Sequence, residues 1–334
     1  MRILVYIEKS DVRGGIEIFA ERHVARLRAE GYDVEIANVL SHKERREHKE
    51  FLCDLCALCG SKELSVDVFD EIIIHKCADV ATLESFPPEK TTLYVHDHEP
   101  ICPRSYAYTP LKHNCTRPSG VWPCLFCAPA CRAWKAALSR VFSQTRRKRV
   151  MARFRKIVVI SEFMKGRLVA NGIPAEIISV EPPVISPAEN AEGAERKESV
   201  DLLYVGQLIR GKGVQLLLAA MARMKTPRTL DVVGAGNMEG ELKALAARLG
   251  LADRVRWRGF QENPQAWMLA AKCVVVPSFW QEPYGLVAAE AVALGRPVVA
   301  FAIGGLPEAC GGKATLVPPG DVSALAAAVE KLKG

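Results

Sequence analysis

The chain has 334 residues, of which 49% are hydrophobic and 25% are charged, and its formal net charge is +7. This length is typical of two globular domains, and the composition excludes a disordered or fibrous chain. No run of about 18 apolar residues occurs, so the sequence predicts no transmembrane helix.

The first half of the chain alternates short β-branched runs with helical patterns. Residues 2–7 predict a buried strand, and Glu8 follows it too early for a secretory signal, so we expect a cytoplasmic protein. A loop containing Gly14 and Gly15 leads into a helix over 14–31. Further strands are predicted at 33–39, 71–77, 91–97 and 156–163.

A second series follows the segment 183–199, whose Pro, Ala and Glu content predicts a linker. Its strands are predicted at 200–208, 229–236, 254–260, 273–278 and 296–301, and its helices at 214–224, 238–250, 285–295 and 321–332. Parallel strands covered on both faces are typical of doubly wound folds, which bind ligands at the carboxyl ends of their strands. We therefore predict an α/β protein with Rossmann-like domains over 1–182 and 200–334, and a ligand site in the cleft between them.

Positive charge is concentrated between Arg132 and Lys156, where ten Lys or Arg and no acid occur. Such a helix is typical of a surface that lies on an anionic membrane or meets a phosphorylated substrate, and a solvated helix face is the third interpretation. Membrane contact would place the protein at the inner face of the membrane. No nucleic-acid-reading module accompanies the basic segment, so nucleic acid is not expected as a partner.

Three glycine turns follow predicted strands. Gly206 precedes Arg210, Lys212 and a helix, Gly234 follows a second strand, and the stretch 11–17 forms the third turn. Amides at a helix N-terminus, the helix dipole and basic side chains all attract phosphate, so this combination predicts diphosphate binding. None of the turns is a Walker loop or a complete G-x-G-x-x-G motif.

Two acids, Glu282 and Glu290, stand in an otherwise apolar segment with seven residues between them. A carboxylate among Leu, Val and Ala is costly unless something hydrogen-bonds it. Carboxylate oxygens accept hydrogen bonds from vicinal hydroxyls, so the pair predicts a site for a sugar and a ribose.

The segment 277–308 reads PSxxxEPYGxVxxEAxAxGxPVVAxxxGGLPE. This pattern resembles the signature of retaining glycosyltransferases of family 4, which have the GT-B fold of two Rossmann-like domains around a cleft. GGIE at 14–17, HDHEP at 96–100 and VVISEF at 158–163 extend the resemblance. It implies that a sugar passes from a nucleoside-diphosphate sugar, held by the second domain, to a glycan or lipid-linked acceptor on the side of the first.

The resemblance also implies roles for single residues. Glu282 would bind hydroxyls of the donor sugar, Glu290 the ribose and Lys212 the diphosphate. The family usually has an arginine directly after the first glycine of the donor domain, where this chain has Gln207; Arg210 is the candidate to replace it. The other implied donor contacts come from Gly14, Gly15, Gly285, Leu286 and Val287.

Two histidines follow the strand at 91–97. His98, which precedes Glu-Pro, best matches the family histidine near the reacting sugar, and His96 is the second candidate. In retaining enzymes of this kind the leaving phosphate deprotonates the incoming hydroxyl, and the protein supplies orientation and charge stabilisation. The sequence has no Asp-x-Asp motif, so no catalytic divalent metal is expected.

Four cysteines form a cluster in a predicted Cys-rich insertion over 100–135. Cys115, Cys124, Cys127 and Cys131 have the spacing C-x8-C-x2-C-x3-C. They predict a structural metal site, with zinc as the first interpretation, an iron–sulfur cluster as the second and free thiols as the third. Cys102 is a candidate replacement ligand.

Two other functions fit part of the pattern. A sugar-nucleotide epimerase or hydrolase of the same fold would act on the donor without an acceptor, although the Glu282–Glu290 motif and the GGLPE segment argue against it. A non-catalytic nucleotide-sugar-binding protein is the other alternative, and Gln207 is the residue that favours it.

Overall fold

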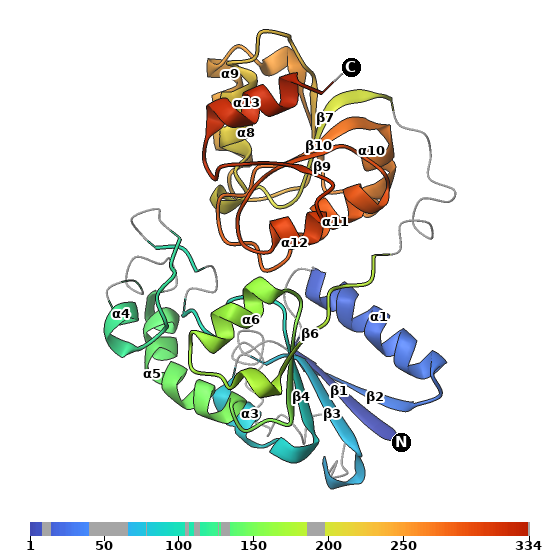
Figure 1. The fold of residues 1–334 in the computed structure, drawn as a ribbon, viewed down its shortest axis with the longest axis vertical. Helices are drawn as coiled ribbons and strands as arrows, with labels where there is room; N and C mark the ends of the chain where they lie inside the picture. The colour runs from blue at the N-terminus through green and yellow to red at the C-terminus, as the bar shows by residue number, and fades with distance from the viewer. Residues whose placement is uncertain are drawn as a thin grey trace. The chain divides into compact units, whose positions relative to one another are not determined.

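The computed structural model describes residues 1–8, 15–39, 66–77, 79–103, 107–109, 114–125, 127, 134–185 and 198–332. The chain divides into two compact units, Met1–Pro182 and Pro183–Gly334 (Figure 1). Each unit contains a six-stranded sheet. Most of the predicted linker, residues 186–197, lies outside the described residues.

The first unit is built on a parallel sheet with the strand order β2-β1-β3-β4-β5-β6. Its strands are β1 (Arg2–Glu8), β2 (Asp33–Val39), β3 (Glu71–Lys76), β4 (Thr91–Val95), β5 (Lys156–Val159) and β6 (Ile178–Val180). Its helices are α1 (Gly15–Ala29), α3 (Val80–Glu84), α4 (Val121–Leu125), α5 (Trp134–Met151) and α6 (Glu162–Val169).

Both faces of this sheet are buried, which explains why its strands read as continuous apolar runs. Successive side chains of β1 point to opposite faces. Leu4 and Tyr6 join the core formed with α3, α5 and α6, whereas Ile3 and Val5 join the core formed with α1.

The second unit repeats this architecture with the strand order β12-β11-β10-β7-β8-β9, again with parallel pairing. Its strands are β7 (Val200–Val205), β8 (Leu230–Val233), β9 (Val255–Gly259), β10 (Ala271–Val276), β11 (Val298–Phe301) and β12 (Thr315–Val317). Its helices are α8 (Val214–Met221), α9 (Glu239–Arg248), α10 (Gln265–Ala270), α11 (Leu286–Ala293), α12 (Leu306–Cys310) and α13 (Val322–Glu330). Helices α8, α9 and α13 pack on one face, and α10, α11 and α12 on the other.

The predicted α/β architecture is confirmed, and most element boundaries shift by a few residues. The run 156–163 divides, because the side chain of Ser161 accepts a hydrogen bond from the Met164 amide and starts α6 directly after β5. Strands β6 and β12 were not predicted from sequence. Each has only three residues, which is too short for a recognisable alternation.

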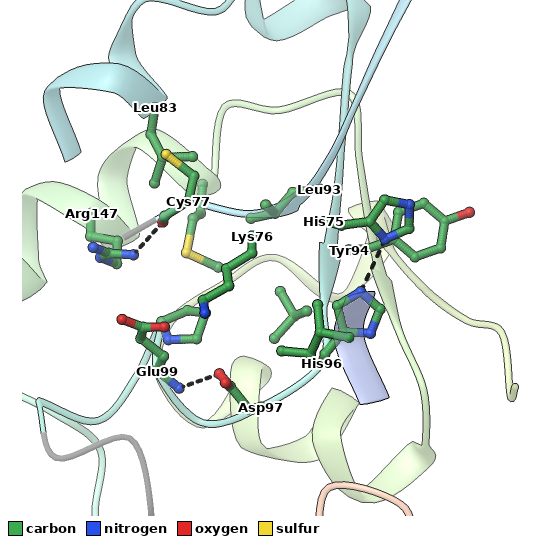
Figure 2. A pocket seen from close by; sticks show the side chains of 14 residues that line it. His75, Lys76, Cys77, Leu83, Leu93, Tyr94, His96, Asp97, Glu99 and Arg147 are labelled. Atoms are coloured by element: carbon green, nitrogen blue, oxygen red, sulfur yellow. Dashed lines mark hydrogen bonds between the residues drawn. The ribbon is translucent and has the colours of Figure 1, made fainter. Parts of the chain in front are cut away.

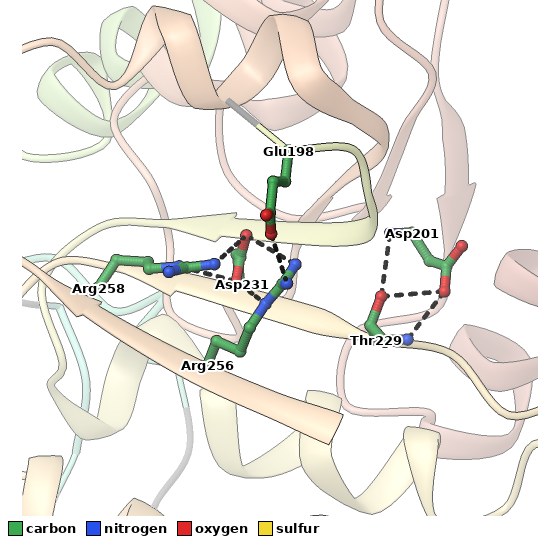
Figure 3. A network of polar contacts seen from close by, with 6 residues as sticks. All are labelled: Glu198, Asp201, Thr229, Asp231, Arg256 and Arg258. Carbon is green, nitrogen blue, oxygen red and sulfur yellow. Dashed lines mark hydrogen bonds and ion pairs between the residues drawn. The ribbon is translucent and has the colours of Figure 1, made fainter. Parts of the chain in front are cut away.

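One buried acid in the second sheet belongs to a structural network (Figure 3). Asp231 on β8 is fully buried and accepts hydrogen bonds from Arg256 Nε at 2.7 Å and Arg258 Nε at 3.0 Å, both on the neighbouring β9. The Arg258 guanidinium also lies 4.9 Å from the ring centroid of Trp267. Two cations on one carboxylate satisfy its charge, and they tie β9 to β8 at the edge of the sheet.

Candidate functional site

The topology of the second unit creates a switch point beside β7. This first strand of the unit lies between β8 and β10, and the chain adds later strands outward on both sides. The connections after β7 and β10 therefore leave the same edge of the sheet in opposite directions. In open α/β sheets such a point, at the carboxyl ends of the strands, is where ligands bind.

Backbone contacts lock together the two glycine turns after β7 and β8. The Gly206 amide donates to the Val233 carbonyl at 3.0 Å, and the Leu208 amide donates to the Ala235 carbonyl at 2.9 Å. Gly234 has φ of 138°, and a Cβ at this position would lie 1.9 Å from the Gly206 carbonyl oxygen. Only glycine fits there, because both the dihedral and the close approach exclude a side chain.

The connection after β10 is attached to its neighbours in the same way. The Phe279 amide donates to the Gly211 carbonyl at 3.1 Å, which joins this loop to the one after β7. The Gly305 amide donates to the Glu282 carbonyl at 2.8 Å, which joins it to the GGLPE segment. The loops that follow β7, β8, β10 and β11 thus form one continuous backbone frame.

The frame holds an ion pair between Lys212 and Glu282. Lys212 Nζ lies 2.7 Å from Glu282 Oε1, and Trp280 Nε1 donates to the same oxygen at 2.9 Å. Glu282 is only 6% exposed. Burial alone would raise the pKa of Glu282, but Lys212 and the hydrogen bonds from Ser278 and Trp280 outweigh it and lower the pKa. Glu282 is therefore a buried carboxylate that stays ionised at neutral pH.

The N-terminus of α11 provides amides beside this pair. Gly285 occupies the N-cap position with φ of 117°, and a Cβ there would lie 2.5 Å from Leu306 Cδ2. Because glycine has no side chain to cap the helix, the first-turn amides of Leu286 and Val287 are not covered from that position. Such amides and the helix dipole attract an anion. Glu290 lies further along the same helix and is partly buried.

Gln207 and Arg210 lie on the loop after β7, and both are exposed. The Gln207 carbonyl accepts a hydrogen bond from the Tyr204 hydroxyl at 2.9 Å, so its backbone is fixed while its side chain faces solvent. Arg210 Nη2 lies 3.7 Å from Glu241 Oε2. A surface pair at this distance contributes little, so the Arg210 side chain can leave it at low cost.

The first unit carries the histidine candidates. His98 is buried, with 2% exposure, and its ring packs edge-on against Phe163. His96 is partly exposed and lines a small pocket together with His75, Asp97 and Glu99 (Figure 2). Gly15 is the first residue of α1, and Gly14 lies outside the described residues.

The cysteine prediction is only partly covered by the structure. Cys124 lies in α4, the Cys127 amide donates to its carbonyl at 3.0 Å, and Cys115 follows shortly after an isolated bridge. Cys131 lies outside the described residues. Among the described residues, no group of three His, Cys, Asp or Glu is arranged to hold a metal ion. The described cysteines of the predicted cluster, Cys115, Cys124 and Cys127, therefore do not support a zinc or iron–sulfur site.

Helix α5 carries the predicted basic segment, and several of its cations are bound within the first unit. Arg146 pairs with Glu84, Arg147 donates to the Cys77 carbonyl at 3.1 Å, and Lys148 donates to the Ser119 carbonyl at 2.8 Å. Arg146 is thus offset by an acid and Arg147 is buried, so neither adds its full charge to the helix surface. Within the described ranges, no helix has both the length and the apolar character needed to cross a bilayer.

Three residues of these sites were not singled out from sequence. Trp280 stands two positions before Glu282, and its indole N–H could have been recognised as a partner for that acid. His23 and His75 were not connected with His96, because helix α1 and strand β3 bring them together only in the folded unit. No local spacing reports such a contact.

The second unit is similar in sequence to known proteins. Residues 199–333 match the family model described as Glycosyl transferases group 1. D-inositol 3-phosphate glycosyltransferase of Streptomyces coelicolor is 41% identical over 121 residues, which cover 32% of this chain and 26% of the relative. Glycogen synthase of Mycobacterium tuberculosis is 37% identical over 144 residues, covering 41% and 34% respectively. The matches thus span about a quarter to a third of the length of these relatives.

Solved structures resemble the chain over nearly its whole length. Anabaena HepE in complex with UDP has a TM-score of 0.64 and 19% identity, covering 99% of this chain and 89% of that one. A glycosyltransferase from Rickettsia africae has a TM-score of 0.67 and 16% identity, covering 98% and 87%. The chain has the two-domain α/β GT-B fold, as predicted.

Proposed function

We propose that the chain is a retaining glycosyltransferase of family 4 that moves a sugar from a nucleoside-diphosphate sugar to an acceptor hydroxyl. The observation that carries this proposal is the Lys212–Glu282 pair, at 2.7 Å, beside the switch point of the second unit. A buried, ionised acid next to a cation and a helix N-terminus suits a ligand that has both hydroxyls and phosphates. The family match over 199–333 covers this part of the chain and supports the assignment.

Each part of the donor has a candidate partner on the second unit. Lys212 and the first-turn amides of α11 bind the diphosphate. Glu282 accepts hydrogen bonds from the transferred sugar, since a carboxylate has acceptor sites beyond the two bonds already made to its Oε1. Glu290 accepts from the ribose, and Gly206 and Gly234 let the phosphate chain approach the backbone. Arg210 supplies the second cation, in place of the arginine that the family usually has at the position of Gln207.

In the proposed reaction the bond between C1 of the sugar and the diphosphate oxygen breaks. A bond from C1 to the acceptor oxygen forms on the same face, and the acceptor proton passes to the leaving diphosphate. Lys212 and the α11 amides stabilise the charge that develops on the leaving group. Of the two histidines, His96 is the better candidate to contact a ligand, because it is more exposed than His98 and lines a pocket of the first unit.

A donor screen tests the proposal. UDP-sugars come first, because the HepE structures hold UDP or UDP-glucose, followed by GDP- and ADP-sugars with glycan and lipid-linked acceptors. The expected result is release of the nucleoside diphosphate that depends on an acceptor, with NMR showing retained configuration at the anomeric carbon. Glu282→Gln should lose most of this activity, and Lys272→Met, at the opposite end of β10, is the matched surface control.

The alternatives give different outcomes in the same screen. An epimerase or hydrolase consumes the donor at the same rate with and without acceptor. A binding protein shows calorimetric affinity for a nucleotide sugar and no turnover. An inverted product would contradict the retaining mechanism.

Peripheral membrane contact through residues 132–156 is proposed as a separate property. It is supported by exposed Arg149 and Phe142 on α5, and by exposed Trp122 on α4, which packs against α5. Sedimentation with anionic and with neutral vesicles tests it. Binding to both kinds, or to neither, contradicts an electrostatic membrane surface.

A further inference from the structure

Three histidines from separate elements of the first unit form a continuous hydrogen-bonded row. His23 on α1 has its Nδ1 at 3.0 Å from Nε2 of His75 on β3. Nδ1 of the same His75 lies 3.1 Å from Nε2 of His96, just after β4 (Figure 2). The middle ring thus uses both of its nitrogens, and the row runs from α1 to the pocket that His96 lines.

Two aromatic rings hold the row in place. Phe19 packs edge-on against all three imidazoles, with ring centroids 4.9 Å from His96 and 5.7 Å from His75. Tyr94 lies against the same three rings and has its centroid 4.7 Å from that of His75. His23 and His75 are both buried. This packing restricts ring rotation, so the two hydrogen bonds persist.

All three rings are neutral at pH 7. Burial, and then the charge of Arg26, lower the pKa of His23 to about 4, while Glu181 opposes the shift. Burial, and then His23, lower the pKa of His96 to about 4, against an opposing effect of Glu17. Burial and its two histidine neighbours place the pKa of His75 well below its ordinary value.

A neutral imidazole has one N–H and one lone pair. His75 must therefore donate through one nitrogen and accept through the other, which makes both hydrogen bonds of the row point the same way. If the row points toward His96, the His96 Nδ1 carries a proton. If it points toward His23, that nitrogen offers a lone pair. The protonation of His96 Nδ1 is thus coupled to His23, two hydrogen bonds away.

We propose that His23 and His75 are positioning residues that fix the tautomer and the ring orientation of His96. His96 then presents one defined hydrogen-bonding group at Nδ1 to a polar ligand. This rests on the proposed function only for the nature of that ligand, a sugar hydroxyl. A second partner that fixes the tautomer of a functional histidine is a recurrent device, because the wrong tautomer offers the wrong group.

The test uses a matched pair of substitutions at the far end of the row. Asn and Leu have nearly the same shape, and the Asn amide can donate to or accept from His75 near the position of His23 Nδ1. His23→Asn therefore keeps the hydrogen bond, and His23→Leu removes it. Imidazole ¹⁵N NMR of the full chain reports each tautomer directly, and with seven histidines single substitutions assign the signals.

The expected result is a single neutral His96 tautomer in the wild type and a mixture in His23→Leu, whereas His23→Asn keeps the hydrogen bond to His75 and with it the orientation of the row. A mixed tautomer in the wild type, or a His96 signal that ignores both substitutions, would overturn the proposal. The wild-type measurement decides the matter alone if His23→Leu does not fold.

An activity arm separates this proposal from the proposed function. If turnover is found, kcat should fall about tenfold or more in His23→Leu, with an unchanged KM for the donor, and recover in His23→Asn. An equal loss in both variants would indicate a structural role and contradict the proposal. If no donor is turned over, the proposed function fails while the NMR result stands on its own.

Discussion

Substituting Lys212 by Met removes the cation from Glu282 and keeps an apolar chain of similar length. The two charged groups are 2.7 Å apart, so their attraction is about 6 kcal/mol at an effective dielectric constant of about 20. Part of this is offset by the cost of burying the ammonium group. Breaking a buried pair by removing one partner typically costs about 3–5 kcal/mol, because the other charge stays buried. We expect a loss of this size in the unfolding free energy of the second unit.

A double-mutant cycle isolates the pair. Glu282→Gln in the Lys212→Met background removes the uncompensated charge, so the double variant should recover at least about 2 kcal/mol relative to Lys212→Met alone. Urea unfolding followed by the fluorescence of Trp257, Trp267 and Trp280 measures this. Lys272→Met is the matched control: it breaks a partly exposed pair with Asp201 in the same unit and should cost less than about 1 kcal/mol.

The pH dependence gives a second measure of the same interaction. The pKa of Glu282 is lowered in the folded state, so the pair stabilises the unit above the ordinary glutamate pKa, and this stability is lost as the pH falls through the lowered value. Without Lys212, burial dominates and raises that pKa above its ordinary value. Glu282 of the variant then takes up a proton on folding, so the variant should gain stability as the pH falls through the raised pKa, whereas the wild type should not. The reasoning is refuted if Lys212→Met matches the wild type in both stability and pH profile.

Nucleotide affinity is also expected to depend on Lys212. A charge-assisted hydrogen bond contributes about 1.5–3 kcal/mol, which corresponds to roughly 10- to 100-fold in affinity. Calorimetry with UDP, the nucleotide held by the HepE structure, should therefore show weaker binding to Lys212→Met by this factor. Binding that is unchanged in Lys212→Met and in the Lys272→Met control would remove Lys212 from the diphosphate site.

Three further predictions concern single positions. Gly234→Ala should lower the melting temperature of the second unit and weaken nucleotide binding, since its Cβ would lie 1.9 Å from the Gly206 carbonyl oxygen; an unshifted melting curve contradicts the loop contact. Trp280→Phe removes one hydrogen bond to the buried Glu282 carboxylate and should lower the unfolding free energy, measured in urea, by about 1.5–3 kcal/mol. A loss of no more than about 1 kcal/mol would mean that this hydrogen bond is absent. The lowered pKa of His23, about 4, means that stability is complete above about pH 6.5 and falls toward pH 4. Between pH 7 and pH 5, His23 should lower the unfolding free energy of the wild type by about 2 kcal/mol. His23→Asn lacks this titrating group, so its unfolding free energy should fall by about 2 kcal/mol less over the same range. Equal losses in the two proteins would contradict the lowered pKa.

The fold followed from local patterns because every layer of it has a local signature. Buried parallel strands read as apolar runs, and the glycines at their ends mark the turns that precede helices. Gly234 and Gly285 could be identified for this reason, since only glycine fits at a position that has no room for a side chain. Edge strands β6 and β12 escaped prediction because three residues contain too little alternation to recognise.

The candidate site was only partly predictable, because its partners are distant in sequence. Glu282 could be recognised as an acid that needed a partner, but Lys212 lies 70 positions away and no spacing connects the two. The members of the histidine row are also distant in sequence: His75 lies 52 positions after His23, and His96 lies 21 positions after His75. Tertiary contacts of this kind depend on sheet order, which the sequence does not state.

The interlocked loops of the second unit have a consequence for how such a protein can diverge. Their contacts run through backbone amides and carbonyls, as between Gly206 and Val233, and the Gln207 side chain takes no part in them. The residue at position 207 can therefore change without moving the frame, whereas exchange of any one loop alone would leave its neighbours without their hydrogen-bond partners. Under the proposed function, donor preference is free to drift by single side chains, and the loops are inherited as a set.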